Sequence, residues 1–298
     1  MEDAGKLDAR YLAFLETIGQ IRPQLHRYCS RMTGSIADGE DVVQDALFRA
    51  YRSLDTYDGS RPLAPWLFRI AHNQCIDFLR RRGVRGEAEI AAAEPDFVAP
   101  DDLSGASVGP AIEHLVLNLP PKERACVLLK EVFDYSLEEI AELVDSTVGG
   151  VKAALTRGRS KLASLGASPA APRVSTPQHH EILRLYVDRF NRRDWDGLRE
   201  LISADARLLV ADRYFGSFAD GGYLGVYSRM PVTWRLTLGD VDGEPMIILL
   251  HHRDDSWAIA GIIRLDIGAD GTIRQVSDYQ HCPWVLTAGS IIAHEFVL

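Results

Sequence analysis

Apolar residues recur at helical spacing through the first part of the chain, and they predict helices over residues 10–85. Residues 35–38 separate the first predicted helix from the second. A turn at 56–60 precedes a third helix, which we expect to run from about residue 62 to residue 82. The positions that carry the spacing are Tyr11, Phe14, Leu15 and Ile18 in the first helix, and Val42, Val43, Ala46, Leu47 and Ala50 in the second.

A second helical segment, residues 111–165, contains two clear helix-start signals. The proline pair at 120–121 stands where the first turn of a helix tolerates proline. Ser136 followed three residues later by Glu139 is typical of a capping box. A short turn at 145–147 then leads into a basic final helix, and two short helices joined by such a turn predict a helix-turn-helix.

Beyond residue 176 the pattern changes to alternating or continuous apolar runs, which are typical of β-strands. We expect helices at 177–192 and 194–203, and strands at 206–211, 232–238, 245–251, 256–266 and 272–280. Helices followed by a meander of strands predict an α+β domain over residues 177–292.

Two segments lack hydrophobic periodicity and predict linkers. Residues 86–110 are rich in Ala, Asp, Glu, Pro, Gly and Ser, which favours an extended acidic linker, and residues 166–176 form a second linker. The net charge of −9 is unevenly distributed. Five arginines and one acid lie between Arg69 and Arg85, and residues 147–166 contain four basic residues and no acid. Because local charge matters more than the sum, DNA binding is compatible with the acidic total.

The third predicted helix combines aromatic, basic and amide side chains in the run PWLFRIAHNQCIDFLRRR. Such a helix suits a surface that binds phosphates, stacks on bases and hydrogen-bonds a base edge. An amphipathic helix with core aromatics and solvated arginines has the same composition. Composition alone leaves both interpretations open.

The bulk composition is that of a soluble globular protein, with 46% hydrophobic and 25% charged residues. No apolar run reaches the roughly 18 residues that span a bilayer, and the N-terminus lacks the features of a secretory signal. Cys29, Cys75, Cys126 and Cys282 form no CxxC pair, which argues against a zinc site or a disulfide framework. We therefore expect a cytoplasmic protein with buried free thiols, no metal and no cofactor.

Several sequence blocks resemble the sigma-70 superfamily, and they stand in the family's order. Residues 41–51 look like region 2.2, residues 65–73 like regions 2.3 and 2.4, residues 119–124 like the opening of region 4, and residues 136–141 with 148–152 like its helix-turn-helix. Recognisable regions 1.1 and 3 are absent, which indicates the short extracytoplasmic-function group. The resemblance ends near Leu165 and implies two all-α sigma domains, a region 2 helical bundle at 10–85 and a region 4 helix-turn-helix at 111–165.

The resemblance also implies roles for individual residues. Those in the polymerase-binding positions are Asp41, Gln44 and Asp45. Those in the −10 DNA-binding positions are Tyr57, Arg69, Asn73, Arg80 and Arg81, with Asn73 reading a base flipped out of the duplex. We expect Trp66 to belong to the core. Candidates for −35 DNA are Lys152, Thr156 and Arg157, with Arg159 and Lys161 on phosphates. Gly150, Ala153 and Ala154 depart from the family's pattern and leave fewer polar groups for base contacts.

The acidic linker has a functional and a structural interpretation. In related sigma factors this linker enters the active-site channel of the polymerase, where Asp96, Asp101 and Asp102 would mimic nucleic acid. A solvated tether would have the same composition.

Residues 177–292 look like the SnoaL-like (nuclear-transport-factor-2-like) fold, a cone made by a curved sheet around helices. The resemblance rests on YVDRFNRRDWDGLRELISADARLLV and on IRQVSDYQHCPWVL. It implies a possible pocket with Tyr214, Trp234, His251 and Asp278 as candidate lining residues. In cyclases and isomerases of this fold a pocket Asp or His serves as acid or base, but structural roles are the alternative.

We therefore expect a non-enzymatic transcription initiation factor that binds core RNA polymerase and promoter DNA. Its C-terminal domain would regulate it in cis, with an unknown small-molecule ligand as a possible further partner. One alternative is a SnoaL-type cyclase or isomerase fused to a DNA-binding module. The other is a helix-turn-helix ligand-sensing repressor, which leaves the region 2 blocks unexplained.

Overall fold

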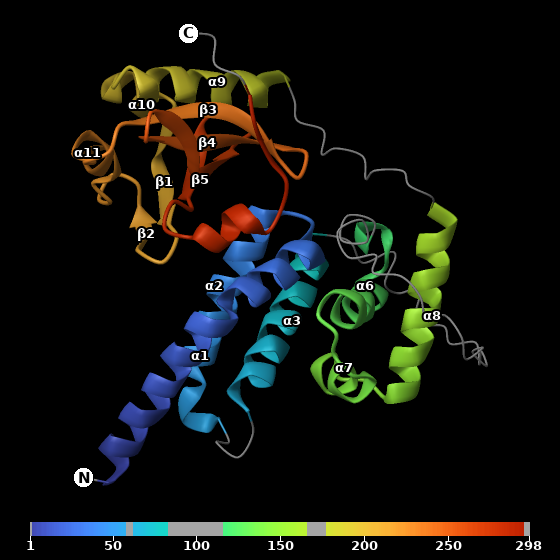
Figure 1. Ribbon diagram of the computed structural model, residues 1–298. Coiled ribbons are helices and arrows are strands. Elements are labelled where there is room, and N and C mark those ends of the chain that lie inside the picture. The colour runs from blue at the N-terminus through green and yellow to red at the C-terminus, as the bar shows by residue number, and fades with distance from the viewer. Residues whose placement is uncertain (1, 58–61, 83–115, 166–176, 295–298) are drawn as a thin grey trace. The chain divides into compact units, whose positions relative to one another are not determined.

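The protein forms two compact units, which we call unit 1 and unit 2 (Figure 1). Unit 1 is Met1–Ala171 and unit 2 is Pro172–Leu298. The structure is a computed structural model that describes residues 2–57, 62–82, 116–165 and 177–294. The predicted linkers 86–110 and 166–176, with Asp96, Asp101 and Asp102, lie outside these described residues.

Three long helices form the first part of unit 1, where the hydrophobic pattern predicts them. They are α1 (Glu2–Thr33), α2 (Ile36–Arg52) and α3 (Leu63–Arg81), with a 3-10 turn, η1 (Leu54–Thr56), after α2. Gly34 follows α1 with φ 79°, a left-handed conformation that glycine tolerates and that commonly ends a helix. The Ser35 side chain then caps α2 by accepting a hydrogen bond from the Asp38 amide. α2 packs back on α1 from this corner.

Short helices form the second part of unit 1. They are η2 (Val116–Asn118), α6 (Pro121–Val127), η3 (Leu128–Val132), α7 (Leu137–Leu143) and α8 (Val148–Leu165). The predicted capping box is confirmed: the Ser136 hydroxyl accepts from the Glu139 amide, and the Glu139 carboxylate accepts from the Ser136 amide at 2.8 Å. α7 and α8 make the predicted helix-turn-helix pair.

The core of unit 1 is continuous across both helical groups. Buried side chains of α1, α2 and α3 belong to the same apolar cluster as those of α6, α7 and α8. Contacts between α3 and α7 and between α1 and α6 join the two groups. Cys29, Cys75 and Cys126 are buried free thiols here, and Cys282 is one in unit 2, as the sequence predicts.

Unit 2 is an α+β domain, which confirms the predicted class. Its helices are α9 (Pro177–Asn191), α10 (Trp195–Glu200) and α11 (Tyr223–Ser228), with a 3-10 turn η4 (Pro283–Thr287). Its strands are β1 (Ile202–Val210), β2 (Tyr214–Ser217), β3 (Trp234–Val241), β4 (Glu244–Arg253), β5 (Ser256–Ile267), β6 (Ile273–Asp278) and β7 (Ile291–Ala293). α9 packs on β3 and β4 (Figure 1).

One seven-stranded sheet runs in the order β2-β1-β6-β5-β4-β3-β7. β1 and β6 are parallel, and the other pairings among the described strands are antiparallel. Register shifts occur between Leu249 and Leu250 and between Asp266 and Ile267. Such bulges bend strands and so curve the sheet around its helices.

The prediction made from the sequence pattern missed several elements of unit 2. The short elements β2, β7 and α11 are absent from the prediction. β1 begins at Ile202, inside the predicted helix 194–203, because α10 ends at Glu200.

Candidate nucleic-acid and partner-binding surfaces

Helix α3 has one outward face and one buried face. The outward face, which we call the α3 outer face, consists of Trp66, Arg69, Asn73, Asp77 and Arg80. These positions are three or four residues apart, so their side chains lie along one side of the helix. Arg69, Asn73 and Arg80 are exposed, whereas Phe68, His72 and Cys75 on the other side are buried.

Two aromatic rings stand at the start of the α3 outer face. Tyr57, directly after η1, and Trp66 have ring centroids 4.8 Å apart with planes tilted by 44°. Trp66 also packs partly buried against the unit 1 core, as the sequence predicts. The pair therefore forms an aromatic surface beside Arg69 and Asn73, and flat surfaces of this kind can stack on bases.

A buried hydrogen bond fixes the rotation of α3 about its own axis. The Tyr28 hydroxyl lies 2.8 Å from His72 Nδ1. Burial lowers the pKa of His72 to about 4, so the ring is neutral near pH 7. Because His72 is held inward from α1, the adjacent Asn73 is directed to the surface.

The arginines at the end of α3 differ in their surroundings. Arg82 donates to the buried Asp38 carboxylate at 2.8 Å and so ties α3 to α2. Arg80 pairs with the half-exposed Asp77 at 3.1 Å, and Arg81 is exposed. Surface pairs of this kind contribute little to stability, so breaking the Arg80–Asp77 pair to contact an anionic partner costs little free energy. The exposed Arg81 can also turn toward such a partner.

The three predicted polymerase-binding residues lie on α2. Asp45 is exposed, and Asp41 and Gln44 are half-buried. Neighbouring atoms that keep water from the Asp45 carboxylate raise its pKa, and the nearby Arg81 opposes that shift. Close to the end of the same helix, a cleft of about 460 Å³ is lined by Phe48, Arg49, Arg52 and Ser53.

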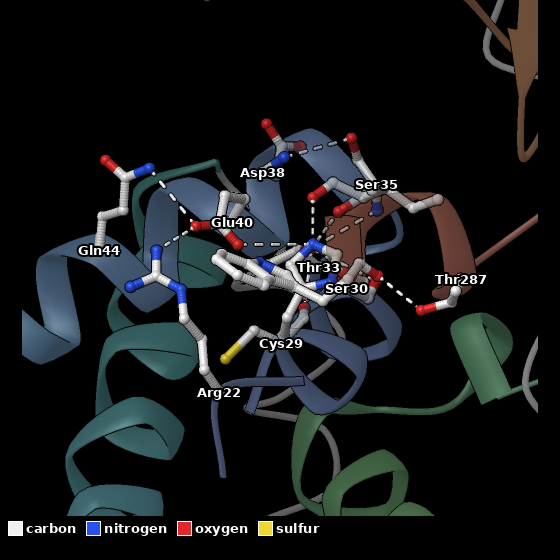
Figure 2. Close-up of polar contacts among 12 residues, drawn as sticks. Arg22, Cys29, Ser30, Thr33, Ser35, Asp38, Glu40, Gln44 and Thr287 are labelled. Atoms are coloured by element: carbon white, nitrogen blue, oxygen red, sulfur yellow. Dashed lines mark hydrogen bonds and ion pairs between the residues drawn. The ribbon is translucent and has the colours of Figure 1, made fainter. Parts of the chain in front are cut away.

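A buried ion pair that the sequence analysis missed holds α2 against α1 (Figure 2). Glu40 is fully buried and accepts a hydrogen bond from Arg22 at 2.6 Å. Gln44 donates to the same Glu40 oxygen at 3.4 Å. His26 bonds the Ile36 carbonyl at 3.1 Å, and burial lowers its pKa, so the ring is neutral. The network therefore fixes the helix that presents Asp41, Gln44 and Asp45.

Helix α8 presents the predicted −35 residues. Lys152, Arg157 and Lys161 are exposed, and Thr156 is half-buried with its hydroxyl donating to the Lys152 carbonyl at 3.0 Å. Arg157 Nε donates to the buried Glu123 carboxylate of α6 at 2.8 Å.

Arg159 also pairs with an acid of the preceding helices. Its Nη2 lies 2.5 Å from the Glu131 carboxylate of η3. Together with the Arg157 pair, this contact anchors α8 and directs the two guanidinium groups.

The candidate pocket residues of unit 2 are only partly brought together. The buried Asp278 carboxylate accepts from the Tyr223 hydroxyl at 2.8 Å and from the Tyr227 hydroxyl at 2.7 Å. Trp234 joins this cluster by donating its indole N–H to the Tyr227 carbonyl at 3.0 Å. Burial raises the pKa of Asp278, although the donated hydrogen bonds act in the opposite direction.

His251 and Tyr214 lie in different surroundings. His251 is the register partner of Trp234 in the β3–β4 pair, and its Nε2 is buried with no hydrogen-bond partner among the described residues. The Tyr214 hydroxyl donates to the Ser217 carbonyl at 3.0 Å within β2.

Aromatic side chains fill the interior around Asp278. The ring centroid of Phe190 lies 4.9 Å from that of Tyr227 and 5.4 Å from that of Trp234. The ring centroids of Tyr223 and Tyr227 are 5.2 Å apart. The sequence analysis missed Tyr223 and Tyr227. Their separation by four residues in YLGVYS was the available signal, since it places both rings on one face of a helix turn.

No helix within the described ranges is long and apolar enough to cross a bilayer. Within the same ranges no cluster of three or more His, Cys, Asp or Glu could hold a metal ion.

Two family models match the chain. Sigma-70 region 2 matches residues 17–85, and Sigma-70, region 4 matches residues 110–162. Among curated proteins, the ECF RNA polymerase sigma factor SigW of Bacillus subtilis is 33% identical over 162 residues, covering 50% of this chain and 87% of SigW. The ECF RNA polymerase sigma factor SigG of Mycobacterium tuberculosis is 33% identical over 214 residues, covering 62% of this chain and 58% of SigG.

Among solved structures, the extracytoplasmic function sigma factor SigJ of Mycobacterium tuberculosis is similar at 17% identity. The match covers 89% of this chain and 95% of SigJ, with a TM-score of 0.36.

Proposed function

The chain belongs to the ECF RNA polymerase sigma factors, and from this premise we propose which of its surfaces bind the polymerase and the promoter. As a sigma factor it binds core RNA polymerase, directs it to −35 and −10 promoter elements and promotes the DNA melting that starts transcription. In this proposal residues 10–85 form region 2 and residues 111–165 form region 4.

The α3 outer face reads the −10 element, and the exposed Asn73 amide beside the Tyr57–Trp66 pair is the observation that supports this most. Extruding a base costs a few kcal/mol, which stacking on an aromatic surface and hydrogen bonds from an amide can offset. Arg69, Arg80 and Arg81 contact phosphates of the same strand.

Helix α2 binds the core polymerase through Asp41, Gln44 and Asp45. The buried Arg22–Glu40 pair supports this role, because it holds the helix in one orientation. A preorganised helix loses less conformational entropy on binding.

Helix α8 lies in the major groove of the −35 element. Lys152, Thr156 and Arg157 face the bases, and Arg159 and Lys161 contact phosphates. The Nε of Arg157 is bound to Glu123, so its contact with DNA uses the terminal nitrogens. Gly150 and Ala153 reduce the number of polar groups near the bases, so sequence discrimination at the −35 element depends on fewer base contacts.

Unit 2 regulates the sigma factor in cis and has no catalytic role of its own. The Asp278 carboxylate supports the second point, because it accepts hydrogen bonds from Tyr223, Tyr227 and Gln280 and so has few positions left to act as acid or base. We assign residues 177–292 to the SnoaL-like fold, with an unidentified small molecule as a candidate effector. The protein acts in the cytoplasm, where its polymerase partner is.

In vitro transcription with core polymerase and Asn73→Ala protein tests the −10 assignment. Loss of a base contact costs about 1–3 kcal/mol, so we expect promoter opening to fall by about fivefold to about 150-fold while core binding is unchanged. Gln20→Ala, an exposed change on α1, is the control. Normal opening by Asn73→Ala would remove Asn73 from the proposal, and a failure of the wild type to bind core would remove the whole assignment.

A further inference from the structure

Glu123 lies outside the DNA-reading helix α8 but contacts one of its arginines. It belongs to α6, the helix on which α8 packs (Figure 1). Glu123 is 5% exposed, and a carboxylate buried to this extent needs a hydrogen-bond donor. Arg157 supplies one, because its Nε lies 2.8 Å from Glu123 Oε1. A residue of α6 therefore fixes the orientation of a side chain of α8.

The residue after Arg157 allows the two helices to approach closely. Gly158 is buried, and a Cβ placed on it would lie 2.9 Å from Val127 Cγ2 and 3.6 Å from Glu123 Cβ. A larger residue at this position would require Val127 or α8 itself to shift. The close approach at Gly158 brings Arg157 within hydrogen-bonding distance of Glu123.

The contact with Glu123 leaves the end of the Arg157 guanidinium group available. A guanidinium group has five N–H donors, one on Nε and two on each terminal nitrogen. Nε is used by Glu123, and among the residues that the structure describes the terminal nitrogens of Arg157 form no hydrogen bond. The Arg157 side chain is 41% exposed, so these nitrogens are accessible to DNA. They present two parallel N–H donors in a fixed plane.

A second arginine–glutamate pair on α8 differs in its burial. Arg159 Nη2 lies 2.5 Å from the Glu131 carboxylate, whose side chain is 31% exposed, whereas the Glu123 side chain is 6% exposed. Ion pairs that are open to solvent are weak. The orientation of Arg157 is therefore fixed more firmly than that of Arg159.

A fixed pair of parallel donors matches one base edge in the major groove. Guanine presents two adjacent acceptors there, O6 and N7, whereas adenine and cytosine each present an amino donor. The negative charge of Glu123 also offsets that of Arg157, which weakens the attraction of Arg157 to phosphates and favours a base contact. Because Gly150 and Ala153 offer no polar side chain, such a contact would account for much of the discrimination at the −35 element.

We infer that Glu123 is a positioning residue for promoter recognition, which orients Arg157 so that its terminal nitrogens bind O6 and N7 of a guanine in the −35 element. Glu123 itself touches no base. The preference at one base pair is then determined by a residue outside the DNA-reading helix. The inference rests on the proposed function, and it adds the base that Arg157 reads and the residue that makes the reading selective.

Transcription by core polymerase with the full chain tests the inference, on promoter fragments whose −35 and −10 elements are randomised. For the wild type we expect one −35 position at which guanine is favoured over each other base by at least about fivefold, and Arg157→Ala should remove this preference. Glu123→Met and Glu123→Ala, which both remove the acceptor, should reduce it to less than about twofold and leave the preferences at other positions intact. Glu123→Gln keeps an oxygen that can accept from Nε and should retain it.

A double variant separates positioning from folding. Glu123→Met combined with Arg157→Ala should have the same −35 preferences as Arg157→Ala alone, because Glu123 acts only through Arg157. Glu131→Ala is the matched control, and it should leave the guanine preference in place.

Three results would overturn the inference: a guanine preference that survives Glu123→Met, an equal loss of preference at all −35 positions in that variant, or a wild type without an Arg157-dependent guanine. Failure of the wild type to start transcription from any fragment would instead contradict the proposed function, so the two failures are distinguishable.

Discussion

At the scale of single residues, the buried polar side chains of unit 1 determine how the surface residues are presented. His72 and Tyr28 position Asn73, and Arg22 and Glu40 position α2. Removing one partner of a buried pair leaves the other charge or dipole unsatisfied, which destabilises a protein by more than the pair itself contributes.

His72 makes the stability of unit 1 depend on pH. Its pKa falls from 6.5 to about 4 because burial disfavours the charged ring. The unfolded chain therefore binds a proton at higher pH than the folded one, and the stability that neutral His72 provides is complete above pH 6.5 and lost as pH falls toward 4. The loss at pH 4 is about 3 kcal/mol.

Urea unfolding of the wild type and of His72→Gln between pH 7.5 and pH 4 measures this effect. Gln cannot titrate, so the difference in unfolding free energy between the two proteins should shrink by about 3 kcal/mol as the pH falls. His26 is unchanged in both proteins and cancels in the comparison. A constant difference over this range would show that His72 becomes protonated in the folded protein.

The candidate surface residues could be located from the sequence because helical spacing alone places Arg69, Asn73 and Arg80 on one face of α3. The buried Arg22–Glu40 pair could not be predicted from the sequence. Both are charged residues within an amphipathic pattern, and their burial depends on how α1 crosses α2, which no local signal encodes.

At the scale of elements, the helices with local signals were predicted best. The corner at Ser35, the capping box at Ser136 and the proline at position 121 all act within one turn of the chain, so the sequence contains their full cause. Helix α11 differs because it has only six residues. Tyr223 and Tyr227 hold it to Asp278, more than fifty residues away, and such a contact cannot be inferred from neighbouring residues.

The capping box of α7 gives a prediction at this scale. Ser136→Ala removes the hydroxyl that accepts from the Glu139 amide, and loss of an N-cap costs about 1 kcal/mol of stability. Ser160→Ala, an exposed change on α8, should stay within about 0.5 kcal/mol. Chemical denaturation of both variants makes the comparison. Equal effects would mean that tertiary packing, and not the cap, fixes the start of α7.

At the scale of the whole molecule, the fold class was predictable and the arrangement within unit 1 was not. The hydrophobic pattern separates two helical segments from an α+β segment. It contains no information about the interface between the two helical groups, where the rings of Phe133 and Tyr28 pack, since these residues are distant in sequence.

Deleting residues 172–298 tests regulation by unit 2. Unit 1 has its own continuous core, so the truncated protein should fold and start transcription in vitro at the same nucleotide as the full chain. In cells we expect its promoter output to differ from that of the full chain by more than about threefold, because a ligand-responsive or inhibitory domain shifts a conformational equilibrium. Equal output under all growth conditions would leave unit 2 without a regulatory role.

The parallel pairing of β1 with β6 has a consequence for the order of events on the ribosome. Val210 at the end of β1 pairs with Asp278, so the β1–β6 pairing cannot form until most of the remaining chain has been translated. At about 5–20 residues per second this delay is several seconds, whereas helices form in microseconds. We therefore expect unit 1 of the nascent chain to fold well before the sheet of unit 2 is complete. For these few seconds each new molecule is a sigma factor whose appended domain has not yet folded.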